Sequence, residues 1–578
     1  MESETSESNL FIVRNKKRCR MFVKVYWRTL FIVSVVILLI PIAFARSGNA
    51  YKCFYVFLVT AVLSISDALH SVAVSIIPLG FATLFKVCGY TILYQIQVRN
   101  ILLDCLAALI LIEAIEYSQL HKRAALKILL TFGCSHYRLS FLLFFTSMFL
   151  AMWISSTLAC GLLMPIVKAV LFELEKLGVV EVYQVIGKDN PQSVRHEQRM
   201  PRPTRFTVFY FLGTAYSVSI GELSTFTGSE TNQIFRIYCE VIFPKAPNIE
   251  FPQFLLLNLP SVLLIETLVY LWMNIYFLGL FRQNTSVQFH VDLSEEESRF
   301  VGTLLTTAYG ELGKISFHEI VIASSVLLTA LVQALMCYSS LDQDYNAFQK
   351  HINISSPTMI CVVLLFLIPI DLQFLKFFQK SDVISGEPLP KTPGKACLSW
   401  TAIRENVDWS ILFILGGSMA IFEALKDTKM TSEFEDFLAN FSTFPAAALL
   451  LVVMVFCKIL SEFACSQCVA YCMLPHIARL SVRCSVNPHY LMMGAALCCA
   501  LPFHLITGTP VNAMVARYVN ISHMEIIKAG VGPSLISVIV IWFAVTLWAT
   551  IIWTDINAYP EWAYDNVFQN NGTRSSRS

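Results

Sequence analysis

Long apolar stretches separated by shorter polar ones run along most of the chain. They lie at about 29–46, 53–82, 140–171, 254–281, 319–338, 358–377, 444–480 and 531–554. A helix needs about 20 apolar residues to cross a bilayer, so each stretch predicts a membrane span. The longest stretches have room for two spans or for one broken helix. The pattern therefore predicts an all-α fold, a polytopic transmembrane helical bundle.

One polar motif interrupts this apolar pattern twice. Thr227-Gly-Ser-Glu-Thr-Asn232 and Thr507-Gly-Thr-Pro-Val-Asn512 share their Thr, Gly and Asn positions. Each lies downstream of a Ser-rich apolar segment that ends at a proline, Ser155–Pro165 in the first half and Cys465–Pro475 in the second. Paired polar breaks in apolar helices are typical of transporter binding sites, where half-helix ends and unwound backbone bind ions. The chain therefore predicts one membrane unit used twice, with two broken helices.

A shorter apolar segment precedes each Ser-rich segment. The first covers about 101–117 and is followed by Leu120-His-Lys-Arg123, and the second covers about 410–425. Each is short for a span and carries small residues near its middle, Ala107-Ala108 and Gly416-Gly417. Small residues also suit ordinary close packing between helices. The same order of segments in both halves favours two re-entrant hairpins.

Composition and charge exclude several classes of function. The 578 residues are 56% hydrophobic and 14% charged, with a net charge of +2, so no basic surface indicates nucleic-acid binding. The 17 cysteines have no regular CxxC spacing, which predicts neither a disulfide framework nor a zinc site. The sequence shows no catalytic triad and no cluster of metal ligands. We therefore expect a membrane protein that is not an enzyme and uses no organic cofactor.

Charges and a sequon near the two ends predict the orientation. Residues 14–28 carry seven Lys or Arg and no acid, which places the N-terminus in the cytosol. Asn571 begins a glycosylation sequon in a polar tail. A glycan there would make the C-terminus extracellular and the number of spans odd, whereas an unused sequon would leave both open. We expect a plasma-membrane glycoprotein.

These features divide the chain into five parts. They are a cytosolic basic segment (1–28), a first half with one repeat (29–280), a cytosolic amphipathic connector (281–318), a second half with the other repeat (319–556) and an extracellular tail (557–578).

Short motifs along the chain resemble those of the divalent anion:sodium symporters, the family of sodium-dependent dicarboxylate and citrate cotransporters. They are Met152-Trp-Ile-Ser-Ser-Thr157 with Met164-Pro165, Leu120–Arg123, Tyr309–Gly313, Leu415-Gly-Gly417, Ser461-Glu462 and Thr509-Pro-Val-Asn-Ala513. The resemblance covers about residues 28–560. It implies a homodimer in the lipid bilayer, with inverted repeats, two re-entrant hairpins and a transport part that moves like an elevator. It also implies two sodium ions flanking one carboxylate anion.

The resemblance assigns residues to each ligand. Backbone carbonyls and hydroxyls supply the oxygens that sodium needs, while hydroxyls and helix N-termini supply donors for an anion. The residues expected at the first sodium are Ser155, Ser156, Gly228, Ser229 and Asn232. Those expected at the second are Ser466, Gly508, Thr509 and Asn512. Those expected at the substrate are Ser156, Thr157, Ser466, Thr509 and Pro510. No metal beyond sodium is expected.

The chain departs from the family signature Ser-Asn-Thr in both halves. The first copy reads Ser155-Ser156-Thr157, and the second has Cys465-Ser466, with Val469 taken as the position of the Thr. On this interpretation both amides are missing, each worth on the order of 1 kcal/mol or more where desolvated. Two functions stay open. One is a secondary transporter of di- or tricarboxylates, sodium-coupled; the other is a paralogue with altered substrate, with proton-coupled or sodium-independent transport, or with only an interaction role.

Acidic residues are a second departure. Glu222 stands where the family has glycine, and Glu230 lies inside the ion-binding turn. A carboxylate near the midplane is costly unless it is paired, protonated or bound to a cation. The two acids predict a proton or cation site; the alternative is a solvated loop edge or an ion pair with Arg236. Glu462 is expected to be structural, and His504 is expected to pack between helices.

Overall fold

The computed structural model describes residues 27–28, 30–44, 49–66, 68, 73–75, 77–78, 100–178, 180–184, 202–226, 228–279, 295–339, 355–371 and 395–564. The basic segment up to residue 26, Thr227 and the sequon at Asn571 lie outside these residues. The described part consists of helices joined by turns and loops, and its β-structure is limited to two isolated bridges, Tyr183 with Pro203 and Pro369 with Ala396. This confirms the all-α prediction.

Helices make up most of the described residues in both halves. In the first half they are α2 (Asn49–Ser66), α5 (Asn100–Tyr117), α6 (Leu120–Phe132), α7 (His136–Ala151), α8 (Ser156–Lys176), α9 (Arg205–Gly221), the short η2 (Glu222–Ser224), α10 (Glu230–Ile242) and α11 (Phe251–Leu278). Next come α12 (Glu295–Glu311) in the connector and α13 (Phe317–Ser339) and α15 (Ser355–Leu367) at the start of the second half. The second half holds α16 (Trp400–Asn406), α17 (Ser410–Asp427), α18 (Met430–Ala439), α19 (Ala446–Phe463), α20 (Ser466–Arg483), α21 (Pro488–Cys499), α22 (Pro510–Tyr518), α23 (His523–Phe543) and α24 (Ala549–Ile552).

Six helices in the described part are long and apolar enough to cross a membrane. They are α2, α8, α11, α19, the segment Phe317–Leu335 of α13, and the run His523–Ile552, in which a π-helical turn joins α23 to α24. The pair α16 and α17, bent by 67°, would be a seventh if it forms one broken span. The predicted stretch 29–46 contains the shorter apolar helix Leu30–Ala43. The apolar pattern therefore found a polytopic membrane protein, and its longest stretches divide into helix pairs.

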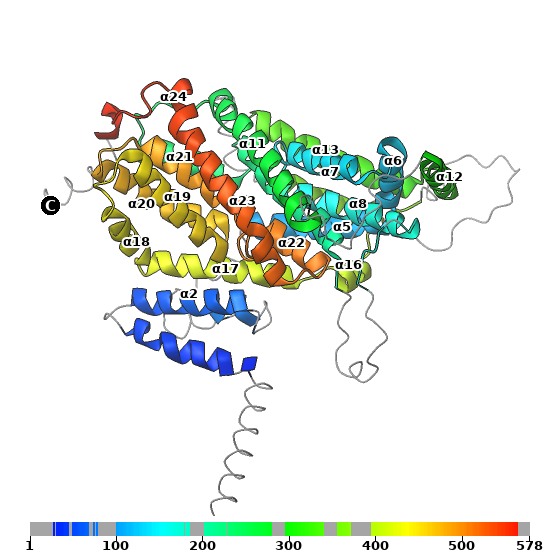
Figure 1. The fold of residues 1–578 in the computed structure, drawn as a ribbon, viewed down its shortest axis with the longest axis horizontal. Coiled ribbons are helices and arrows are strands. Elements are labelled where there is room, and N and C mark those ends of the chain that lie inside the picture. The colour runs from blue at the N-terminus through cyan, green and yellow to red at the C-terminus, as the bar shows by residue number, and fades with distance from the viewer. Residues whose placement is uncertain are drawn as a thin grey trace, which may run out of the picture.

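The two halves repeat the same set of helix contacts. α7 packs on α9, and α8 packs on α5, α6 and α9; correspondingly, α19 packs on α21, and α20 packs on α17, α18 and α21. The short helices are exchanged, because α10 packs on α20 while α22 packs on α8. Figure 1 shows the halves side by side, with α11 and α23 in contact between them. The two halves thus share one pattern of helix packing, and the inverted repeats stay a prediction.

The segments predicted as re-entrant hairpins are helices that end in the same way. Gln119 lies two residues after the end of α5, and Lys429 lies two residues after the end of α17. Both residues have a left-handed φ of 60°, and the next helix begins directly after each. Two of their small residues lie at close contacts. A Cβ on Gly417 would come within 2.1 Å of the Ser75 carbonyl oxygen, and a Cβ on Gly161 of α8 would meet Ala108 at 3.4 Å, whereas Gly416 has nothing within 4 Å of its Cβ position. Gly417 and Ala108 therefore lie at helix contacts, the alternative that the sequence left open, and the re-entrant hairpins stay a prediction.

Candidate functional site

The two Asn residues of the repeated motif make the same contacts in both halves. Asn232 Nδ2 donates to the carbonyl oxygens of Thr225 at 2.9 Å and Leu223 at 3.4 Å. Asn512 Nδ2 donates to those of Pro502 at 2.9 Å and Leu505 at 3.4 Å. In each residue the Oδ1 atom is buried and has no hydrogen-bond partner. A buried, unsatisfied oxygen is unusual in a folded protein, and two at matching positions fit two cation sites.

The glycine of each motif lies where the chain is too crowded for a side chain. A Cβ on Gly228 would lie 2.9 Å from the Glu222 carbonyl oxygen and 3.1 Å from that of Ala151. A Cβ on Gly508 would lie 2.6 Å from Pro502 Cβ and 2.8 Å from the Ser461 carbonyl oxygen. Glycine therefore lets the break approach the end of α7 or α19.

A threonine hydroxyl bonds each break to the C-terminal end of the helix before the Ser-rich tip, α7 or α19. Thr225 Oγ1 donates to the carbonyl oxygen of Met152 at 2.9 Å, and Thr507 Oγ1 donates to that of Glu462 at 2.9 Å. Met152 and Glu462 occupy equivalent positions, three residues before the first residue of each Ser-rich segment. The Ser-rich tip and the broken helix of each half thus form one unit.

The tip of the second half is bonded directly to its own break. Ser466 N donates to the Gly508 carbonyl oxygen at 2.9 Å. Thr509 caps α22 by accepting from Asn512 N at 3.3 Å, and Pro510 is the first residue of that helix. The four residues predicted for the second sodium are all buried and lie in this one unit.

The tip of the first half differs from the expected sodium geometry in one respect. Ser155 caps α8 by accepting from Leu158 N at 3.3 Å. Its hydroxyl donates to Asp104 Oδ2 at 2.9 Å, and its backbone N–H donates to Gln333 Oε1 at 3.2 Å. Asp104 and Gln333 were not predicted for this site, because nothing in their local sequence marks them. Of the other residues predicted for the first sodium, Ser156 is the first residue of α8, and Gly228, Ser229 and Asn232 lie around the break, where the Ser229 and Thr231 hydroxyls are 2.7 Å apart.

The first and second units meet at their acidic residues. The buried Glu222 carboxyl, 5% exposed, lies beside Ser156 and within electrostatic range of Glu230, which in turn lies near Cys465 of the second tip. Glu222 is therefore not at a solvated loop edge. Arg236 Nε pairs with Glu240 Oε1 at 3.1 Å. The structure thus places both acids where the two repeats meet.

An amide that the sequence analysis missed stands at the second tip. Ser155 and Cys465 cap α8 and α20 at equivalent positions, so an ungapped match of Cys465-Ser466-Gln467 to Ser-Asn-Thr favours Gln467 over Val469 at the Thr position. Gln467 Oε1 accepts from Ser466 Oγ at 3.0 Å and from Cys465 Sγ at 2.7 Å. The second tip therefore carries a carboxamide one position later than the signature does.

Glu462 holds the loop that leads to the second break. It accepts from Phe503 N at 3.0 Å and from His504 N at 2.8 Å, and Lys458 Nζ lies 3.4 Å away. These bonds agree with the structural role expected for Glu462. His504 was expected only to pack between helices, but its Nδ1 lies 2.9 Å from Glu462 Oε1 and 3.2 Å from Ser534 Oγ. The nearby carboxylate gives this ring a polar role.

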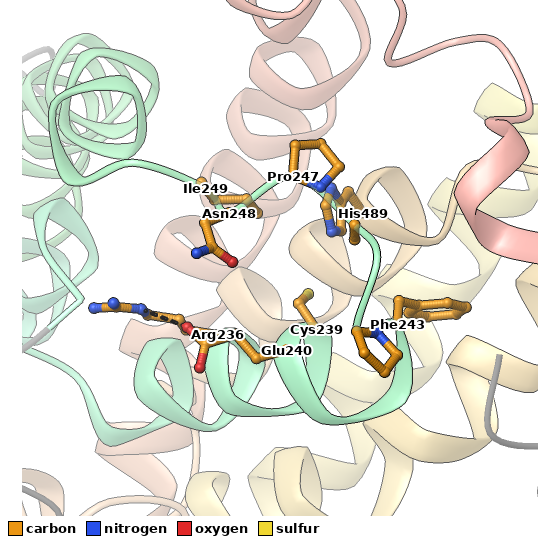
Figure 2. A pocket seen from close by; sticks show the side chains of 10 residues that line it. Arg236, Cys239, Glu240, Phe243, Pro247, Asn248, Ile249 and His489 are labelled. Carbon is orange, nitrogen blue, oxygen red and sulfur yellow. Dashed lines mark hydrogen bonds and ion pairs between the residues drawn. The ribbon is translucent and has the colours of Figure 1, made fainter. Parts of the chain in front are cut away.

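A separate small pocket lies at the C-terminal end of α10. Figure 2 shows Arg236 and Glu240 of α10, Asn248 of the following loop and His489 of α21 around it. Its lining includes none of the residues predicted for sodium or for an anion. We therefore do not assign the transported ligand to this pocket.

Comparison with known proteins covers nearly the whole chain. The family model described as the sodium:sulfate symporter transmembrane region matches residues 23–554. The protein I'm not dead yet of Drosophila melanogaster is 30% identical over 94% of this chain and 92% of its own length. The human Na(+)/dicarboxylate cotransporter 3 is 25% identical over 93% of this chain and 94% of its own length. Human solute carrier family 13 member 1 is 24% identical over 94% of this chain and 98% of its own length.

Proposed function

Because the chain belongs to the sodium:sulfate symporter family, we propose that it is a sodium-coupled secondary transporter of small di- or tricarboxylate anions. The observation that carries this proposal is the pair of buried amide oxygens, Asn232 Oδ1 and Asn512 Oδ1, without hydrogen-bond partners. Each lies in a helix break lined by backbone carbonyls. Such oxygens suit a desolvated sodium ion, which the residues around the two breaks would hold.

The ligands in the two proposed sodium sites are neutral oxygens, and the Glu230 carboxylate of the first motif is not among them. At the first break the candidates are Asn232 Oδ1, the Ser229 hydroxyl and the backbone near Gly228. At the second they are Asn512 Oδ1, the Thr509 hydroxyl and the backbone near Gly508. A bound sodium would complete the coordination of both amide oxygens and would supply positive charge between the halves.

The anion would bind between the two tips. Ser156, Thr157 and Ser466 bring hydroxyls from the first turns of α8 and α20, and Gln467 adds a carboxamide. Helix N-termini attract carboxylates. Glu222 and Glu230 act against this attraction, since they lie in the same region. The proposal therefore requires that a cation neutralise the acids before or together with anion binding, which would couple the two ligands.

The same two acids favour a second candidate function, proton-coupled transport. Glu222 is buried beside Ser156 and close to a second carboxylate, an arrangement that a proton would also relieve. Uptake that follows a proton gradient and ignores sodium would favour this candidate.

The wider family features belong to the same proposal. We infer a homodimer in the plasma membrane whose tips and broken helices move together past α13 and α15, by an elevator mechanism. The contacts that support a common moving body are those of α8 with α9 and α22 and of α20 with α10 and α21.

Uptake into proteoliposomes tests the proposed function. Labelled succinate, citrate and sulfate would be offered under an inward sodium gradient, a potassium gradient or a proton gradient. We expect succinate or citrate to accumulate only with sodium. Uptake of sulfate alone would overturn the proposed substrate class, and uptake of none would favour an interaction role.

A further inference from the structure

We propose that Asp104 forms an additional monovalent cation site with Ser155, Thr157, Gln333 and Thr358. The site lies among α5, α8, α13 and α15 and includes neither Asn residue of the repeated motif. It shares Ser155 with the first predicted sodium site and Thr157 with the predicted anion site, so this inference rests on the proposed function and adds a ligand set to it.

Asp104 is a buried carboxylate with one unsatisfied oxygen. The residue is 6% exposed. Its Oδ2 accepts from Ser155 Oγ at 2.9 Å, whereas its Oδ1 is buried and has no hydrogen-bond partner. Polar atoms this deeply buried nearly always have a partner, so Oδ1 is placed to bind a ligand.

Neutral oxygen atoms from three further helices surround the carboxylate. The hydroxyls of Thr157 on α8 and Thr358 on α15 lie beside it. Gln333 on α13 joins the backbone of Ser155 to the Thr358 hydroxyl, because its Oε1 accepts from Ser155 N at 3.2 Å and its Nε2 donates to Thr358 Oγ1 at 3.0 Å. Thr157, Gln333 and Thr358 are themselves buried. The group is therefore a built polar site inside an apolar region.

The chemistry of these atoms selects a monovalent, hard cation. An ionised carboxylate in the apolar interior needs a positive partner, and among the described residues no Lys, Arg or His forms an ion pair with Asp104. Hydroxyl, amide and carboxylate oxygens suit sodium better than soft metals. One carboxylate balances one charge, and the described part of the chain holds no group of three His, Cys, Asp or Glu suited to a metal ion.

Stabilisation of the α8 N-terminus is the main structural alternative. A carboxylate near a helix start is favourable without any ion. Here, however, Asp104 accepts from the Ser155 hydroxyl, while the backbone N–H groups of Ser155 and Leu158 donate to Gln333 Oε1 and Ser155 Oγ. Capping of α8 is thus done by other atoms, which leaves Asp104 Oδ1 for a cation.

Sodium-dependent thermal stability of the purified full-length protein in lipid nanodiscs tests the site. Sodium chloride would replace N-methylglucamine chloride at constant ionic strength, without substrate. We expect Asp104→Asn to raise the sodium concentration for half-maximal stabilisation by roughly tenfold or more, because a charged ligand is lost. The matched control is Glu113→Gln, since Glu113 is a buried acid on the same helix and accepts from Asn406 Nδ2 at 2.8 Å. The control should behave as wild type.

A second variant keeps the test informative if Asp104→Asn does not fold. Thr358→Val removes one hydroxyl and leaves the charge, and we expect an increase of about threefold in the same sodium concentration. An unchanged sodium dependence in the variants that fold would overturn the site and favour a protonated or helix-capping Asp104.

Variants of the repeated motif separate this inference from the proposed function. Loss of sodium stabilisation in Asn232→Leu and Asn512→Leu but not in Asp104→Asn would leave the proposed function and remove the additional site. Loss in Asp104→Asn alone would keep the Asp104 site and contradict the two Asn-centred sites.

Discussion

At the scale of single residues, the amide oxygens of Asn232 and Asn512 define where a cation fits. Both amide nitrogens are fixed to loop carbonyls, so the oxygens cannot exchange places with them without losing two hydrogen bonds. This fixes the orientation of each side chain before any ion binds. Pre-orientation of this kind lowers the cost of ion binding.

Gln467 leads to a prediction about anion recognition. Gln467→Ala should raise the KM for succinate by roughly tenfold, since the second tip then loses its only carboxamide donor near Ser466. Transport kinetics in proteoliposomes would measure this. Gln467→Glu should be worse than Gln467→Ala, because a negative charge repels the anion. Equal KM values in wild type and both variants would show that Gln467 does not face the substrate.

The buried acid Glu222 leads to a prediction about coupling. If a cation must neutralise this carboxylate before the anion binds, Glu222→Gln should lower the sodium concentration needed for half-maximal succinate uptake. A threefold decrease or more is expected, on the order of the 1 kcal/mol cost of one nearby like charge. Sodium titrations of uptake at pH 6 and pH 8 would measure it. An unchanged sodium titration would show that Glu222 has no role in coupling. Uptake that acid stimulates without sodium in wild type, but not in Glu222→Gln, would show that Glu222 couples transport to protons.

The local sequence marks the residues of the repeated motif, but it does not mark residues that only the folded chain brings together. Asn232 and Asn512 are marked by the same spacing in both halves. Asp104 is one of three acids in α5, and its partners Gln333 and Thr358 lie more than 200 residues away. Such a site depends on how α5, α8, α13 and α15 pack, which local sequence does not encode. Gln467 was visible in the sequence and was missed through a gap in the assumed alignment.

At the scale of helices, the breaks depend on glycine at one position in each half. Gly508 lies where a Cβ would meet Pro502 and the Ser461 carbonyl, whereas Gly416 on α17 has nothing within 4 Å of its Cβ position. Gly508 is therefore required for steric reasons, whereas at Gly416 a side chain would meet no neighbour.

Gly508→Ala and Gly416→Ala form a matched pair. Gly508→Ala should lower stability by about 1–3 kcal/mol through overpacking and should weaken sodium binding, because the break has to shift. Gly416→Ala should be neutral or stabilising by up to about 1 kcal/mol through helix propensity. Thermal unfolding in nanodiscs with and without sodium would measure both. Equal effects in the two variants would contradict the close contact at Gly508.

The order of helices could be predicted from the sequence, but the places where they turn could not. The short segments before each Ser-rich tip were found, and α5 and α17 match them closely. Hydropathy reports only that a residue avoids water, so it did not divide 140–171 into α7 and α8 or 444–480 into α19 and α20. Those turns are set by caps and by bonds such as Ser466 N to the Gly508 carbonyl.

At the scale of the whole molecule, the two halves are joined through exchanged helices. α10 of the first half packs on α20, and α22 of the second half packs on α8 (Figure 1). Each helix that begins at a Ser-rich tip therefore packs on the short helix that follows the break of the other half. Family membership over residues 23–554 confirms the resemblance inferred from the motifs, which are spread along the same range.

Orientation in the membrane is a prediction for the chain ends. An epitope at the N-terminus should be accessible only in permeabilised cells, because residues 14–28 are strongly basic. Asn571→Gln should remove a mass shift that a glycosidase also removes, while Asn440→Gln, at another sequon, should not. A C-terminal tail reachable only from the cytosol would contradict an odd number of spans.

Sodium-driven uptake in variants of the two motif Asn residues is the most direct test of the central claim. Asn232→Leu, Asn512→Leu and the control Asn487→Leu, which changes a buried cap of α21, would be reconstituted and assayed with labelled succinate and citrate. We expect sodium-dependent uptake in wild type and in the control, and its loss in both motif variants, with all four proteins equally incorporated. Undiminished sodium-dependent uptake in Asn232→Leu and Asn512→Leu would contradict the assignment of the two sodium sites.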